Sequence, residues 1–153
     1  MMIGNASVFY CELRRDLSEI RDALVEDGKM KDLFLDECAL IVKFADIVKK
    51  QGFLELESYI LKLEESGNDI NADLKRMIKM VIDGTDPLLI EDIQMKRYFS
   101  AGMSEYEGFM FLVYLDSALY IQQAVPKYVI EESLKSYMPD KLWEEFENMM
   151  ENT

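Results

Sequence analysis

Three pairs of adjacent glutamates carry the side chains in this sequence that could serve a reaction or bind a metal ion. They are Glu64 with Glu65, Glu131 with Glu132, and Glu144 with Glu145. Two neighbouring carboxylates can divide the roles of general acid and general base, or they can bind a hard divalent cation. On a helix, however, adjacent side chains point about 100° apart, so such a pair usually lies on a solvated face. We therefore expect these glutamates to be surface charges rather than catalytic or metal-binding groups.

Other groups that enzymes commonly use are missing from the sequence. It contains no histidine, the side chain used most often as a general base and as a metal ligand. The two cysteines, Cys11 and Cys38, are far apart and have no imidazole partner, which argues against a nucleophilic thiol and against the usual zinc sites. Glycine-rich loops that hold dinucleotides or nucleotide phosphates are also absent. The sequence therefore predicts a protein that is not an enzyme and needs no cofactor.

The composition indicates one domain, spanning residues 1–153, with a strongly acidic surface. The net charge is −13 and the isoelectric point is near 4.4. Such a chain repels nucleic-acid phosphates and anionic membrane surfaces, whereas a partner with a basic face would be attracted. The simpler interpretation is that the acidic residues only keep the protein soluble.

A cytoplasmic protein without a membrane span is expected. Residues 1–5 lack the cationic start and apolar run of a signal peptide, and the cysteines are typical of buried free thiols in a reducing compartment. The most apolar stretch, residues 109–121, is shorter than the roughly 20 residues of a spanning helix and contains Asp116. We expect it to form a helix inside the core.

Apolar residues recur at helical spacing along the whole chain, and no useful strand alternation is present. The predicted helices cover residues 6–25, 32–50, 53–65, 72–83 and 87–98; a sixth begins after the capping-box residue Ser104, and two more have Pro126 and Pro139 as their first residues. Gly28, Gly52 and Gly84 are expected to end helices. The fold class predicted is all-α, a single-domain bundle of about seven or eight helices with Val42, Ile78 and Ile82 in its core.

Three segments, in the same order along the chain, carry a resemblance to a known family. They are residues 44–57 (FADIVKKQGFLELE), 77–87 (MIKMVIDGTDP) and 118–139 (ALYIQQAVPKYVIEESLKSYMP). Together they resemble the cytoplasmic regions of the MotA family, the proton-channel subunits of the bacterial flagellar stator. The resemblance covers roughly two-thirds of the chain and implies a helical domain that works by contact with other proteins.

The sequence departs from the family where the membrane helices should lie. Members of the family carry two membrane helices before the large cytoplasmic loop and two more between that loop and the C-terminal motif. Residues 99–117 are too few for two membrane passes, and the first motif is preceded by a single polar-faced helix. The resemblance therefore implies no proton conduction.

The resemblance also implies a surface for binding the rotor. In the family, charged residues on the loop helices contact the rotor protein FliG. Lys79 matches the helix that carries the basic contact, with Lys75 and Arg76 on the same expected side, and Glu91 and Asp92 match the following helix, which carries the acidic contacts. The simpler interpretation is that all five are ordinary solvated charges.

The expected function is thus a non-enzymatic interaction domain that contacts a FliG-like rotor protein or a stator component. A helical adaptor or regulatory protein of an unrelated pathway is the alternative. The sequence leaves self-association open, and it does not identify the partner.

Overall fold

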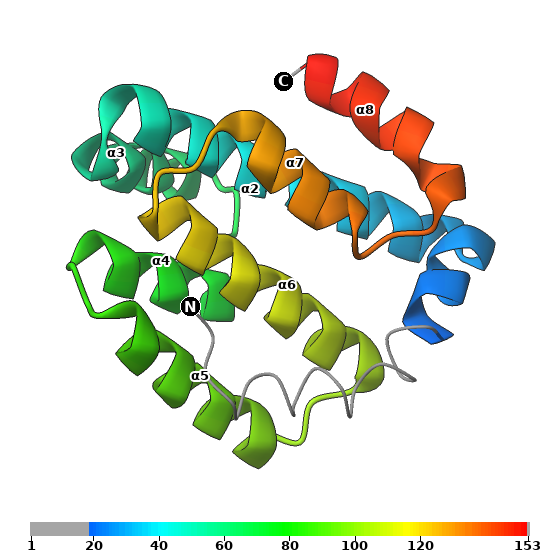
Figure 1. The fold of residues 1–153 in the computed structure, drawn as a ribbon, viewed down its shortest axis with the longest axis horizontal. Coiled ribbons are helices and arrows are strands. Elements are labelled where there is room, and N and C mark those ends of the chain that lie inside the picture. Colours follow the sequence, from blue (N-terminus) through cyan, green and yellow to red (C-terminus); the bar gives the residue numbers. More distant parts are fainter. Residues whose placement is uncertain (1–18, 153) are drawn as a thin grey trace.

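The computed structural model describes residues 19–152, and these form a bundle of helices (Figure 1). Residues 19–26 form a helix, which Asp27 separates from the next helix. The elements that follow are α2 (Gly28–Gln51), α3 (Phe53–Glu65), α4 (Ala72–Ile82), α5 (Pro87–Ser100), α6 (Glu105–Gln122), α7 (Lys127–Lys135), the short 3-10 helix η1 (Asp140–Leu142) and α8 (Trp143–Glu151). No β-strand occurs among the residues described. The predicted all-α bundle is confirmed.

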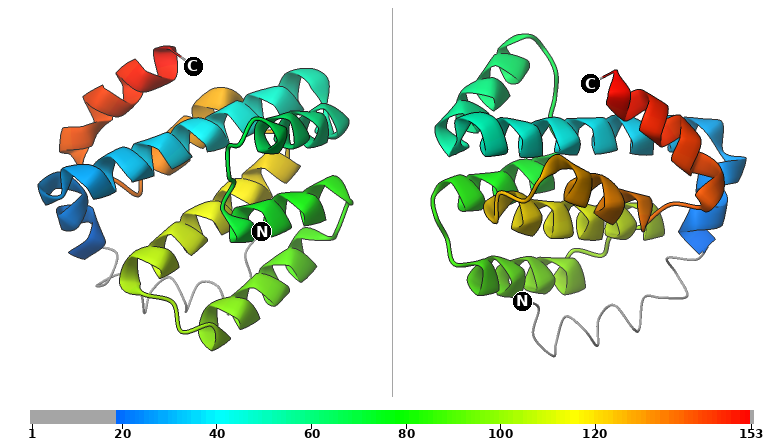
Figure 2. Two further views of the ribbon diagram at one scale, coloured as in Figure 1. Left: turned by 180° about the vertical axis from the view of Figure 1, so that it is seen from behind. Right: turned by 45° about the horizontal axis from the view of Figure 1, so that its top comes forward.

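Helix α6 is the centre of the arrangement. It packs against α2 and α7 on one side and against α4 and α5 on the other, while α3 and α8 pack on α2. In the right-hand view of Figure 2, α2 runs across the upper half of the molecule with α3 and α8 above it, and α5 lies along the lower edge. Nearly every side chain of α6 from Gly108 to Leu119 is buried, including Phe111, Leu112 and Val113. The apolar stretch at 109–121 is therefore a core helix, as predicted.

No helix formed by residues 19–152 combines the length and the hydropathy that crossing a membrane requires.

Local capping signals in the sequence place several helix starts correctly. Ser104 and Glu107 form a complete capping box, in which each side chain accepts a hydrogen bond from the other residue's backbone amide. Asp86 caps α5 by accepting from the amide of Leu88, and Pro87 occupies the first turn, where no amide donor is needed. Helix α3 has the predicted bounds, and α4 begins at the predicted residue.

The expected helix end at Gly28 is wrong. Asp27 separates residues 19–26 from α2, and its carboxylate accepts from the amides of Lys29 and Met30. Gly28 is therefore the first residue of α2, which begins four residues earlier than predicted. An Asp at the N-cap satisfies amides that a helix start leaves without partners. This gain outweighs the glycine's tendency to end a helix.

Other predicted bounds are off by one or two residues. Pro126 and Pro139 are N-caps rather than first helical residues of α7 and η1. Helix α5 continues to Ser100, two residues beyond the prediction. The segment from 139 to 150 splits into η1 and α8, with Leu142, Phe146 and Met150 buried.

One contiguous core joins the helices. Val42 and Ile78 are fully buried, as predicted, but Ile82 is only half-buried because it ends α4. Cys38 is buried as expected. Ile20 and Leu24 of the predicted first helix are also buried, whereas residues 6–18 of that helix, and Cys11 with them, lie outside the described residues.

Candidate functional site

The three basic residues predicted to bind a partner lie together on the exposed side of α4. Lys75 forms an ion pair of 2.6 Å with Glu64 of α3, and Lys79 forms one of 3.6 Å with Asp83 one turn later. Arg76 pairs with Asp73 on its own helix. All three side chains remain at least half exposed, at 50%, 77% and 52%. Exposed pairs of this kind add little to stability, so their charges stay accessible to a partner.

Asp73 connects α4 to α5. Its Oδ1 atom accepts from the guanidinium of Arg97 at 2.7 Å and also from Arg76. The hydrogen bond and the charge of Asp73 raise the pKa of Arg97 above its ordinary value. Because the single carboxylate of Asp73 contacts the guanidinium groups of both Arg76 and Arg97, these three side chains together carry one net positive charge between α4 and α5.

The two acidic residues predicted to bind a partner on α5 differ in exposure. Asp92 is exposed and forms an ion pair of 2.9 Å with Lys96. Glu91 is 7% exposed and lines a separate cavity of about 170 Å³ together with Asp116, so its assignment as a surface contact is wrong. Adjacent helical residues point about 100° apart, and this rotation carries Glu91 inward when Asp92 faces outward.

Apolar side chains occupy much of the outer face of α5, a feature that the sequence interpretation missed. Leu88, Leu89, Ile93 and Phe99 are exposed by 40–65%. Among the residues described, helix α5 packs mainly against α4 and α6, and it lies at the edge of the bundle (Figure 1). The sequence does contain an indication of this exposed apolar surface. The run from Leu88 to Ile90, followed by Ile93, places apolar residues on more than one face of the helix, so they cannot all face the core.

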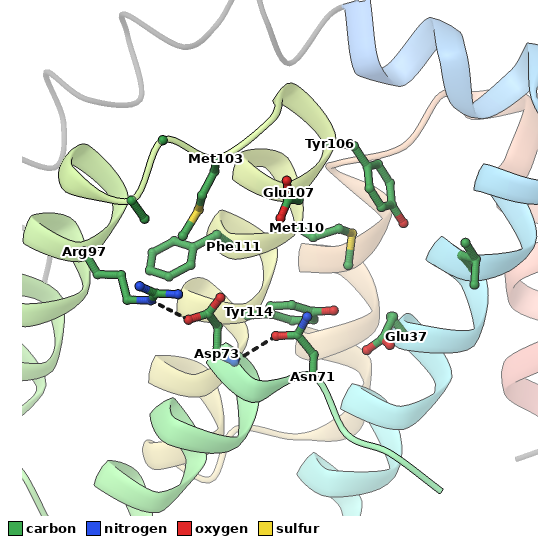
Figure 3. Close-up of a pocket in the computed structure, with 13 residues that line it drawn as sticks. Glu37, Asn71, Asp73, Arg97, Met103, Tyr106, Glu107, Met110, Phe111 and Tyr114 are labelled. Carbon is green, nitrogen blue, oxygen red and sulfur yellow. Dashed lines mark hydrogen bonds and ion pairs between the residues drawn. The ribbon is translucent and has the colours of Figure 1, made fainter.

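A cavity of about 300 Å³ lies between α2, the start of α4, the end of α5 and α6 (Figure 3). Glu37 of α2 and Tyr106 and Tyr114 of α6 lie at one end. Arg97 lies at the other end, and its ion-pair partner Asp73 lies between it and Tyr114. The connection between α5 and α6, from Ala101 to Met103, and the side chains of Met110 and Phe111 complete the wall.

Glu37 is the unusual group in this cavity. Its Oε2 atom is buried and has no hydrogen-bond partner among the described residues. Burial raises the pKa of Glu37, a hydrogen bond with Tyr114 lowers it in part, and the nearby charge of Asp36 raises it further. Glu37 is half-buried as a residue, but its buried Oε2 atom has lost contact with water without gaining a partner in the described part of the chain, which makes the ionised form costly.

The groups around Glu37 respond to its charge. Burial, with the Glu37 charge as the second cause, raises the pKa of Tyr106 to about 12 and raises that of Tyr114 still further. The pKa of the Cys38 thiol is raised for the same two reasons. Both phenols and the thiol are therefore protonated at neutral pH, which leaves Glu37 as the group here that changes charge most readily.

Glu37→Gln is expected to stabilise the fold at neutral pH. The raised pKa means that the carboxyl of Glu37 binds its proton more tightly in the folded protein than in the unfolded chain. At low pH the carboxyl is protonated in both states and costs no stability, whereas stability is lost as the pH rises through the folded pKa and Glu37 must ionise. The gain in urea midpoint should thus be larger at pH 8 than at pH 5, which keeps the protein above its isoelectric point. The exposed Glu57→Gln is the matched control. Equal midpoints for wild type and Glu37→Gln at pH 8 would contradict this expectation.

Four of the six glutamates that form adjacent pairs in the sequence make ion pairs with basic residues. Glu64 pairs with Lys75, Glu131 with Lys127, Glu132 with Lys135 and Glu145 with Lys31. Across residues 19–152, no three side chains of metal-binding type come together.

No protein-family model, curated protein or solved structure matches the chain. The resemblance to the MotA family therefore remains a prediction from the motifs.

Proposed function

We propose that this protein is a non-enzymatic protein–protein interaction domain that docks on a FliG-like rotor protein through its α4–α5 face. This face comprises Lys75, Arg76 and Lys79 of α4 together with Leu89, Asp92 and Ile93 of α5. The observation that carries the proposal is the exposed apolar strip of α5 beside exposed basic residues of α4. Exposed apolar surface rimmed by charge is typical of interaction sites.

The charges of the face favour an acidic partner surface. Five basic side chains around it, those of Lys75, Arg76, Lys79, Lys96 and Arg97, share four carboxylates. Asp86 at the N-cap of α5 and Glu91 within it bring the acidic side chains of the region to six, so the region is close to neutral in a chain that carries −13 overall. An acidic partner would be repelled by most of the surface and much less here, where Lys79 is 77% exposed, which would orient its approach.

The apolar strip supplies the expected centre of the contact. Leu89 and Ile93 are one turn apart on α5, in line with Arg97, which reaches across to Asp73 of α4. An apolar centre with a charged rim is the usual division of roles in an interface. The partner surface should therefore present apolar side chains surrounded by acidic ones.

The proposal is tested with purified FliG from the same genome in surface-plasmon measurements at low and moderate salt. Lys79→Glu should weaken binding roughly fivefold at low salt, mainly through the association rate, and less at moderate salt. Lys50→Glu on α2 is the matched control, because Lys50 is also a largely exposed lysine paired with an aspartate one turn away. Leu89→Ser should weaken binding roughly tenfold at either salt concentration, since it removes apolar area from the centre.

The control for Leu89→Ser is Leu54→Ser on α3, where the leucine is 80% exposed and lies outside the face. All four variants should keep the melting temperature nearly unchanged. Absence of FliG binding by the wild type at any salt would overturn the rotor function and favour the adaptor interpretation. Equal losses in the α4–α5 variants and in their controls would show that the face is misplaced.

A further inference from the structure

We propose that the cavity between α2 and α6 binds a small organic cation, an amine with an apolar body, whose ammonium group donates a hydrogen bond to Glu37. This site goes beyond the proposed docking function and does not depend on it.

The need for a cation follows from the groups around Glu37. Its Oε2 atom is buried and finds no donor among the described residues. The guanidinium group in the cavity wall belongs to Arg97, and its Nε atom is held by Asp73 at 2.7 Å rather than by Glu37. An ammonium group in the cavity would give Glu37 both a donor and a counter-charge, which is the arrangement that buried charges require.

The net charge of the cavity wall has the same sign as Glu37. Asp73, Glu37 and Glu107 line it, and these three carboxylates outnumber the two guanidinium groups of Arg97 and Arg76, which share Asp73. Glu107 uses a carboxylate oxygen to accept from the backbone amide of Ser104, so it is held by the capping box. The wall therefore attracts a positive ligand and repels an anion.

Aromatic and thioether groups cover the rest of the cavity. Tyr106, Tyr114 and Phe111 provide rings, and Met103 and Met110 provide sulfur (Figure 3). Ring faces attract ammonium groups, and methionine adapts to apolar ligands of different shape. The volume of about 300 Å³ is at the small end of ligand pockets, so the ligand should be a small amine.

The first test uses phenethylamine as the charged probe and 2-phenylethanol as its neutral counterpart of nearly equal size. Titrations of the whole protein, followed by amide NMR shifts, should show phenethylamine binding with a Kd of about 0.1–1 mM, as expected for a ligand of this size. The shifts should concentrate on residues around Glu37 and Tyr114. 2-Phenylethanol should bind at least roughly tenfold more weakly, because it cannot form the charged hydrogen bond.

The second test changes the carboxylate. Glu37→Gln should weaken phenethylamine binding about tenfold and leave 2-phenylethanol binding unchanged. Asp36→Asn removes the same charge from the adjacent, exposed position outside the cavity wall and should leave the affinity within about twofold.

The third test supplies the cation from the protein itself and does not depend on the Glu37→Gln variant. Leu33 lies one turn before Glu37, lines the cavity and is 49% exposed, so a longer polar side chain is tolerated there. Leu33→Lys places an ammonium group within reach of Glu37. It should reduce phenethylamine affinity about tenfold, whereas Leu33→Met should not.

The proposal fails if the neutral and charged probes bind equally, because the cavity is then merely apolar. It also fails if phenethylamine causes no shift around Glu37 at several millimolar, or if Leu33→Lys and Leu33→Met have the same effect. None of these results bears on FliG binding, so the two proposals can fail separately.

Discussion

Ile78→Ala should lower the free energy of unfolding by about 2–5 kcal/mol. Ile78 is fully buried on α4, where the helix packs against α6, so truncation removes apolar contacts and leaves a cavity that the close-packed core fills only in part. Urea unfolding, followed by circular dichroism with a common m-value, gives the change directly.

The same substitution one turn later is the matched control. Ile82 ends α4 and is only half-buried, so Ile82→Ala should lower the free energy of unfolding by no more than about half as much. Both variants change the same side chain on the same face, so helix propensity affects them alike and the difference reports burial. Equal losses in the two variants would contradict the position that the structure gives to the end of α4.

This contrast shows how far periodicity can predict a core. Helical spacing predicts one inward face of α4 made of Leu74, Met77, Ile78, Val81 and Ile82, and the structure buries all of these except Ile82. Periodicity gives the direction of a side chain, but it does not tell where neighbouring helices end. Ile82 has the correct direction and lies at the margin of the contact with α6, which depends on how the two helices cross.

The error at Glu91 has a different physical cause. Helix α5 carries apolar residues around most of its circumference, so its sequence has no clear polar face from which an orientation can be read. The orientation is fixed by tertiary packing, including the contact of Tyr98 with Phe111 of α6, whose ring centroids are 6.0 Å apart. Residues on an amphipathic helix such as α4 were placed correctly because the helix itself distinguishes its faces.

The cavity could not have been predicted from local patterns. Its walls come from the first half of α2, the beginning of α4, the end of α5 and the first half of α6, which are far apart in sequence. Glu37 lies beside the buried Cys38 on a helix that is apolar on two sides, and this position was the available signal. A carboxylate at such a position suggests burial, but only the packing of α6 against α2 shows which groups surround it.

The capping residues explain why the starts of α5 and α6 were predicted correctly. A side chain such as Asp86 or Ser104 bonds to amides two or three residues away, so the signal and its effect are local. A glycine is less specific, because it fits both a left-handed position after a helix and an ordinary helical position. Gly52 and Gly84 have positive φ angles of 94° and 78°, in keeping with their predicted role, whereas Gly28 does not.

Alanine should therefore have opposite effects at two glycines that look alike in the sequence. Gly84 follows α4 with a φ angle of 78°, and the amide of Thr85 donates to the carbonyl oxygen of Met80 to close the helix. A Cβ atom there would meet nothing within 4 Å, so backbone strain of about 1–2 kcal/mol is the expected loss. Gly28 is the first residue of α2, where a Cβ atom would also meet open space, and its φ angle is not positive.

Gly28→Ala should raise the free energy of unfolding by about 0.4–1 kcal/mol, because alanine restricts the unfolded chain and fits the helical conformation. Gly84→Ala restricts the unfolded chain to the same extent, but alanine is strained at the positive φ angle of this position. Its free energy of unfolding should therefore lie about 1–2 kcal/mol below that of Gly28→Ala. Urea midpoints of the two variants, measured beside the wild type, check both the sign and the difference. A loss of stability in Gly28→Ala as large as that in Gly84→Ala would place Gly28 at a left-handed helix end and reject the start of α2 at this residue.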